Sequence, residues 1–186
     1  MDAYNLERLN FLVVDDNRHM RSLVRSVLRA LGARHIEEAT DGADAYARLG
    51  TYATDVIICN WQMSPMDGLE FVRLLRTDTD SPNPFVPVIM LTAHTEAKRV
   101  MEARDAGVTE FLAKPISAHR LYSRIRAVIE RPRPFVRAKS YVGPDRRRRQ
   151  DADFKGLERR TQDTAGQPEE GGDGLTAAKV KTLLDK

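Results

Sequence analysis

The sequence has a single cysteine, Cys59, and no apolar run that approaches the length of a membrane-spanning helix. A lone cysteine excludes an internal disulfide, and its place inside an apolar run favours a buried thiol. The first ten residues lack the pattern of a secretory signal, in which a basic stretch precedes an apolar one. From these absences we expect a cytoplasmic protein with no membrane span.

Large apolar residues are scarce between Ile129 and a short cluster near the C-terminus. A segment that buries little apolar surface does not offset the entropy cost of ordering its chain. We therefore expect one folded domain over residues 1–130 and a largely disordered tail over 151–186, with a candidate short helix at 175–185. No helix-turn-helix, kinase or cyclase pattern follows Glu130, so DNA binding is not expected.

Positive charge is concentrated between the expected domain and the tail. Residues 131–150, RPRPFVRAKSYVGPDRRRRQ, hold eight basic residues and one acid, whereas the whole chain has a net charge of +3. Such a stretch attracts anions: nucleic acid, a nucleotide, an acidic protein or a membrane surface. A solvated basic linker is the alternative interpretation.

Short apolar runs alternate with helical patterns along residues 1–130. The runs with the character of buried strands are 11–14, 35–39, 56–59, 86–91 and 109–113. Each is followed by a segment whose apolar residues recur at three- and four-residue steps, as in an amphipathic helix. Strict alternation predicts an α/β fold, with helices on both faces of a parallel sheet and a ligand site at the carboxyl ends of the strands.

Polar residues stand at the ends of four predicted strands: Asp15 and Asp16, Asn60, Thr92, and Lys114. Adjacent carboxylates repel each other unless a cation lies between them, and Mg²⁺ prefers such oxygen ligands. A hydroxyl and an ammonium group beside the metal would donate hydrogen bonds to an anion. Each residue alone could be a polar strand terminus, but together they predict a site for phosphoryl transfer.

Five segments carry a resemblance to a known family: LVVDD at 12–16, DVIICN at 55–60, MDGL at 66–69, LTA at 91–93 and LAKP at 112–115. They resemble the receiver domains of bacterial two-component response regulators, over about residues 8–130. The resemblance implies a flavodoxin-like (βα)5 fold, a doubly wound parallel sheet of strand order 2-1-3-4-5. It also implies a single-domain, CheY-like regulator of a phosphorelay that acts by protein contact and is not an enzyme.

The same resemblance implies partners and residue roles. A histidine kinase or phosphotransfer protein would supply the phosphate, and a downstream protein would dock on the last two helices and the fifth strand. Thr92 and Lys114 would bind phosphoryl oxygens, Phe111 would be an aromatic switch or a core residue, and Lys114–Pro115 would be a cis peptide bond. The implied Mg²⁺ ligands are Asp15, Asp16, Asn60 and the backbone carbonyl of Gln62.

The family has an aspartate where this sequence has Asn60. An aspartyl phosphate forms when a carboxylate oxygen attacks phosphorus, and an amide oxygen is a far weaker nucleophile. The amide also removes one of the acidic groups around the metal. We therefore predict a receiver that is not phosphorylated at residue 60 and binds Mg²⁺ more weakly. A natural pseudo-receiver and an Asp-to-Asn variant both fit, and retention of the other site residues favours the variant.

The arginine-rich segment resembles the tails of certain CheY-like proteins that bind cyclic di-GMP and act at the flagellar motor. Arginine forks match phosphate oxygens and the O6/N7 edge of guanine, and aromatic rings stack on bases. RNA or an acidic protein surface fits the same charge. The candidate residues for binding a dinucleotide are Arg131, Arg133, Arg137, Tyr141, Asp145, Arg146, Arg147, Arg148 and Arg149.

Overall fold

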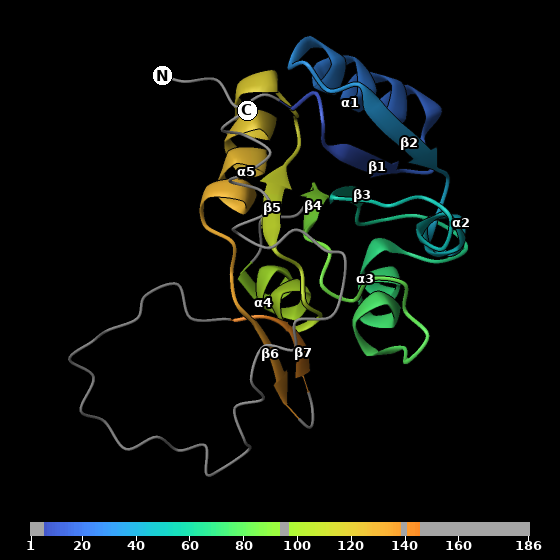
Figure 1. Ribbon diagram of the computed structural model, residues 1–186, viewed down its shortest axis with the longest axis vertical. Helices are drawn as coiled ribbons and strands as arrows, with labels where there is room; N and C mark the ends of the chain where they lie inside the picture. The colour runs from blue at the N-terminus through green and yellow to red at the C-terminus, as the bar shows by residue number, and fades with distance from the viewer. Residues whose placement is uncertain (1–5, 94–96, 139–140, 146–186) are drawn as a thin grey trace, which may run out of the picture.

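The computed structural model describes residues 6–93, 97–138 and 141–145, and its main element is a five-stranded parallel sheet (Figure 1). Its strands are β1 (Asn10–Val14), β2 (His35–Ala39), β3 (Val56–Asn60), β4 (Val88–Thr92) and β5 (Glu110–Ala113). They pair in the order β2-β1-β3-β4-β5. The doubly wound sheet and its strand order are therefore confirmed.

Five helices cover the two faces of the sheet: α1 (Arg18–Ala30), α2 (Gly42–Leu49), α3 (Gly68–Thr77), α4 (Ala97–Asp105) and α5 (Ala118–Glu130). Alternate residues of a strand point to opposite faces, so β1 contributes Phe11 and Val13 to one core and Leu12 and Val14 to the other. The first core lies under α1 and α5, and the second lies under α2, α3 and α4. No described helix is long and apolar enough to span a membrane.

Side-chain oxygens cap the N-termini of α1, α2, α3 and α5. Asp67 caps α3 in a capping box with Glu70, and each side chain accepts a hydrogen bond from the backbone of the other, so two N–H groups left over by the helix are satisfied.

Between α2 and α3, the Tyr46 hydroxyl donates to Asp78 Oδ2 over 2.6 Å. Burial raises the pKa of Tyr46 to about 12, and this hydrogen bond lowers the pKa of Asp78 below its ordinary value.

A β-hairpin follows α5. Strands β6 (Phe135–Ala138) and β7 (Tyr141–Pro144) pair antiparallel, and the Asp145 N–H donates to the Pro134 carbonyl over 2.7 Å to close the base. The sequence reasoning ended the folded domain at residue 130 and did not predict this hairpin. Both strands lie within the arginine-rich segment predicted at 131–150, and the bounds of 1–130 for the receiver domain stay a prediction. The predicted disordered tail and the candidate helix at 175–185 lie outside the described residues.

Candidate functional site

The predicted site residues meet at the carboxyl ends of the strands. Asp15 follows β1, Asn60 ends β3, Thr92 ends β4 and Lys114 follows β5. Because these four strands are neighbours in the sheet, their ends converge on one rim. Asp15, Asn60 and Thr92 are buried, and 24% of the Lys114 side chain is exposed.

The Asn60 amide bridges two groups of this rim. Lys114 Nζ donates to Asn60 Oδ1 over 2.9 Å, and Asn60 Nδ2 donates to the backbone carbonyl of Gln62 over 2.7 Å. An ammonium group can only donate and a carbonyl can only accept, so these two partners fix which end of the amide is oxygen. An aspartate at this position could accept from Lys114, but it could not donate to Gln62.

Asp15 presents an unsatisfied carboxylate oxygen to the same site. Its Oδ1 accepts from the Asn17 N–H over 2.9 Å. Its Oδ2 is buried, lies 3.8 Å from Lys114 Nζ, and has no hydrogen-bond partner among the residues that the structure describes. Burial raises the pKa of the Asp15 carboxyl above its ordinary value, and the Asn17 N–H and Lys114 partly oppose that rise.

These donors fit a magnesium ion in part. The orphaned oxygen of Asp15, the exposed carboxylate of Asp16 and the Gln62 carbonyl are hard oxygen ligands of the kind that Mg²⁺ takes. The Gln62 carbonyl, however, already accepts from the Asn60 amide, so a cation would have to displace that hydrogen bond. The described residues contain no group of three or more acidic, histidine or cysteine side chains placed so that they could hold a metal ion.

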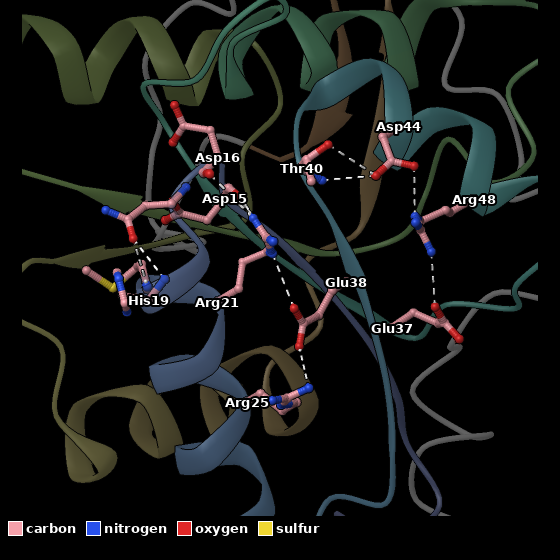
Figure 2. A network of polar contacts seen from close by, with 12 residues as sticks. Asp15, Asp16, His19, Arg21, Arg25, Glu37, Glu38, Thr40, Asp44 and Arg48 are labelled. Atoms are coloured by element: carbon pink, nitrogen blue, oxygen red, sulfur yellow. Dashed lines mark hydrogen bonds and ion pairs between the residues drawn. The ribbon is translucent and has the colours of Figure 1, made fainter.

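Arg21 holds the turn formed by Asp15 and Asp16 in place, and the sequence did not predict this role for the arginine. Figure 2 shows its side chain between the Asp15–Asp16 turn and β2. Arg21 Nη1 donates to the Asp15 backbone carbonyl over 2.7 Å, and its Nε pairs with Glu38 Oε2 over 3.2 Å. Arg25 binds the other Glu38 oxygen over 3.0 Å. An arginine one turn into a helix is ordinarily solvated, so no local signal marked this role.

Gly68 allows the loop after β3 to pack directly on the site. A Cβ atom on Gly68 would clash with the backbone carbonyl oxygen of Asn60. The Gly68 N–H donates to the Trp61 carbonyl over 2.8 Å, which folds the loop back on the end of β3. Any side chain at residue 68 would therefore displace Asn60.

Two further expectations concern β5 and the loop after it. The Lys114–Pro115 bond is cis, as predicted, and Ser64–Pro65 is a second cis bond that was not predicted. Phe111 is half-buried and packs against the core under α2, α3 and α4. Its place suits a core residue and a switch residue equally, so the switch role stays a prediction.

Five of the candidate dinucleotide residues lie in the described part of the chain, at the end of α5 and in or beside the hairpin. Arg133 pairs with Glu110 over 3.2 Å, and the Tyr141 hydroxyl donates to the Pro144 carbonyl over 2.6 Å. Arg131 ends α5, Arg137 is an exposed residue of β6, and Asp145 closes the base of the hairpin. The remaining candidates, Arg146, Arg147, Arg148 and Arg149, lie outside the described residues.

Comparison with known proteins identifies the family. The pattern of the response regulator receiver domain matches residues 11–126, so the chain belongs to that family. Chemotaxis protein CheY-3 of Vibrio cholerae serotype O1 is 32% identical over 131 residues, which are 70% of this chain and 99% of that protein. The hairpin lies beyond the residues that the family pattern matches.

Solved structures agree with this assignment. CheY4 of Vibrio cholerae is 32% identical with a TM-score of 0.59, over 64% of this chain and 98% of that one. The receiver domain of sensor histidine kinase PA1611 from Pseudomonas aeruginosa PAO1 is 26% identical with a TM-score of 0.57, over 63% and 94%. That domain holds a magnesium ion in its active-site cleft.

Proposed function

We propose that this chain is a response regulator of a phosphorelay that signals by protein contact, is not an enzyme, and carries no phosphoryl group at residue 60. The observation that supports this is the bridging amide of Asn60, which accepts from Lys114 and donates to the Gln62 carbonyl. The family pattern and the CheY relatives support the regulator role and a cytoplasmic place of action.

The chemistry at Asn60 is unfavourable for two reasons. The amide oxygen bears no negative charge, and its position is held by the hydrogen bond from Lys114. The amide nitrogen also occupies the side of the Gln62 carbonyl where the resemblance implies a metal. Magnesium, when bound, would neutralise charge on an incoming phosphoryl group. In this chain Lys114 and Thr92 would hold the anion without a competent nucleophile.

The partners of this function are proteins. A histidine kinase or phosphotransfer protein would dock near Asn60, and the surface of α4, β5 and α5 would bind a downstream protein. Lys114 would couple the state of the site to the docking surface, because its hydrogen bond joins Asn60 on β3 to the end of β5. With Asn60 in place this link persists without phosphate, so the docking surface should stay in one state.

Labelling by acetyl phosphate and Mg²⁺ tests the proposal, with intact mass and peptide mapping as the readout. The unaltered chain should gain no phosphoryl group, and Asn60→Asp should gain one at residue 60. An Asp15→Asn change added to Asn60→Asp should abolish that gain, since it removes a metal carboxylate. Labelling of the unaltered chain at residue 60 would contradict the proposal. Failure of Asn60→Asp to label would show that the rest of the site is not competent.

The alternative from the sequence is that the arginine-rich segment makes the chain a cyclic di-GMP effector at the flagellar motor. Arg133 pairs with Glu110 of β5 and the Tyr141 hydroxyl donates to the Pro144 carbonyl, so such a site would rest mainly on Arg137 and on the arginine run that begins at residue 146. Calorimetric titration with cyclic di-GMP, using the unaltered chain and an Arg147/Arg148→Ala form, decides it. No heat at micromolar concentrations would end this hypothesis.

A further inference from the structure

The β6–β7 hairpin packs on the end of the domain opposite to Asn60. Its Phe135 side chain contacts Arg76, in the last turn of α3, and Phe85, just before β4. The Phe135 ring lies 5.0 Å from the Arg76 guanidinium carbon and makes an edge contact with the Phe85 ring at 5.4 Å. These residues belong to the connections that enter the strands, so the hairpin lies far from the strand exits that form the candidate site.

Strand β7 meets the turn between α4 and β5 backbone to backbone. A Cβ atom on Gly143 would lie 2.9 Å from Gly107 Cα, and one on Gly107 would lie 3.1 Å from the Val142 carbonyl oxygen. Gly107 has φ +97°, a conformation that favours glycine. A pair of glycines thus permits a contact that side chains would prevent, which indicates a built interface and not an accidental touch.

The linker before the hairpin reaches β5 as well. Arg133 Nη2 pairs with Glu110 Oε1 over 3.2 Å, and the side chains of this pair are 18% and 13% exposed. The other oxygen of Glu110 lies 3.5 Å from Arg124 Nη1 on α5. Strand β7 therefore contacts the turn after α4, and Arg133 contacts the start of β5 and reaches α5 through Glu110. Glu110 immediately precedes Phe111, the residue in the predicted switch position.

The docked hairpin also covers the charge of Arg76, for which the described residues supply no acidic partner. Arg76 is 2% exposed and donates to the Pro84 carbonyl over 2.6 Å and to the Gly107 carbonyl over 3.2 Å. Its Nη2 has no hydrogen-bond partner within the described residues, and burial lowers the pKa of Arg76 to about 9. Burying a cation is costly, and a two-stranded hairpin is marginally stable alone. The cost of burying the Arg76 cation and the marginal stability of the hairpin both oppose docking. They therefore favour a contact that opens and closes.

We propose that residues 131–145 are a reversible intramolecular clamp, which holds the α4–β5 segment from the end opposite to the phosphoryl site. Docking fixes Gly107 and Glu110, and release frees the entrance of β5 and the residue in the switch position. The clamp gives this chain a second point of control that does not require chemistry at Asn60. It goes beyond the proposed function, and it stands or falls independently of whether residue 60 is phosphorylated.

The test compares Phe135→Ala with Val136→Thr in the full chain. Phe135 carries the contacts with Arg76 and Phe85, whereas Val136 is the next residue of the same strand and is 40% exposed. Threonine keeps the branched shape that suits a strand. Trypsin cleavage after Arg137 reports opening of the hairpin, and amide hydrogen exchange over residues 97–113 reports the α4–β5 segment.

Phe135→Ala should raise both the cleavage rate and the exchange rate by about tenfold, which corresponds to about 1.4 kcal/mol. Val136→Thr should change neither, and exchange in β3 should stay constant. Faster cleavage with unchanged exchange over 97–113 would show that the hairpin is a passive appendage. Unchanged cleavage, or an equal rise in β3, would also overturn the proposal. Glu110→Gln provides a second variant, since it weakens the Arg133 contact without creating a cavity, and it should raise exchange over 97–113 in the same direction.

Discussion

Replacing Asn60 with aspartate should make the stability of this fold depend on divalent cations. In the present chain the Asn60 amide donates to the Gln62 carbonyl over 2.7 Å and so satisfies that group without a metal. An aspartate carboxylate in the same place would face the carbonyl oxygen with no proton between them. It would also add negative charge beside Asp15, whose Oδ2 is already buried without a hydrogen bond.

The size of the effect follows from these contacts. Leaving a buried acceptor unsatisfied costs about 1–3 kcal/mol. The new carboxylate would gain a charged hydrogen bond from Lys114, now 2.9 Å from Asn60 Oδ1, which offsets part of that cost. We expect a net loss of about 2 kcal/mol, or roughly 6–8 °C in the melting temperature of a domain of this size. Binding of magnesium, at about 100 times its dissociation constant, would raise the free energy of unfolding of the Asn60→Asp form by about 2.7 kcal/mol.

Thermal unfolding followed by circular dichroism, with Mg²⁺ or with a chelator, measures the change in melting temperature and its dependence on Mg²⁺. Asn83→Asp is a matched control, because it makes the same chemical change in the loop before β4. There the side chain accepts from the Phe85 N–H over 3.1 Å, which a carboxylate can also do. The unaltered chain and the control should melt at nearly the same temperature with and without Mg²⁺. An equal Mg²⁺-dependent rise in the unaltered chain, or an Asn60→Asp form that is more stable with chelator, would refute the reasoning.

Two further predictions concern the helices around the site. Tyr46→Phe should raise the pKa of Asp78, because the lowered value depends on the hydrogen bond from the Tyr46 hydroxyl. A carboxyl group whose pKa is lowered in the folded protein stabilises the fold at pH values above its ordinary pKa of about 3.9. That stabilisation is lost as the pH falls through the pKa of the folded state. The variant should lose less stability across that acidic window, and an NMR titration that leaves the Asp78 pKa unchanged would contradict this. Gly68→Ala should lower the free energy of urea unfolding by about 3 kcal/mol, because its Cβ atom would meet the Asn60 carbonyl. Gly32→Ala is the comparison: its Cβ atom would meet no atom within 4 Å, so it should cost only about 1 kcal/mol, for its φ of +95°. Equal costs would refute the steric argument.

The strand-end residues were predictable because each lies where an apolar run stops. A parallel sheet brings such points together whatever the details of packing, so Asp15, Thr92 and Lys114 could be assigned to one rim. The hydrogen bonds of Asn60 were not predictable. One of its partners is the backbone of Gln62, and the other is Lys114, which is 54 residues away in sequence.

The hairpin shows where local patterns are insufficient. Its strands are only four residues each, and neither shows the apolar alternation that marks a half-buried strand. Their stability comes from Arg76, Phe85 and Gly107, which lie far earlier in the chain. An arginine in the last turn of an amphipathic helix is ordinarily exposed, so Arg76 carried no sign that it would be buried.

The sequence by itself determined the alternation of strands and helices, the family, and the presence of an amide where a carboxylate is expected. Periodicity and residue identity carry that information along the chain. Only the tertiary structure decided that Asn60 bridges Lys114 and Gln62 and that β6 and β7 pair and pack against α3 and the α4–β5 turn. These features depend on distances between residues remote in sequence, and such distances are set by the packing of the whole domain.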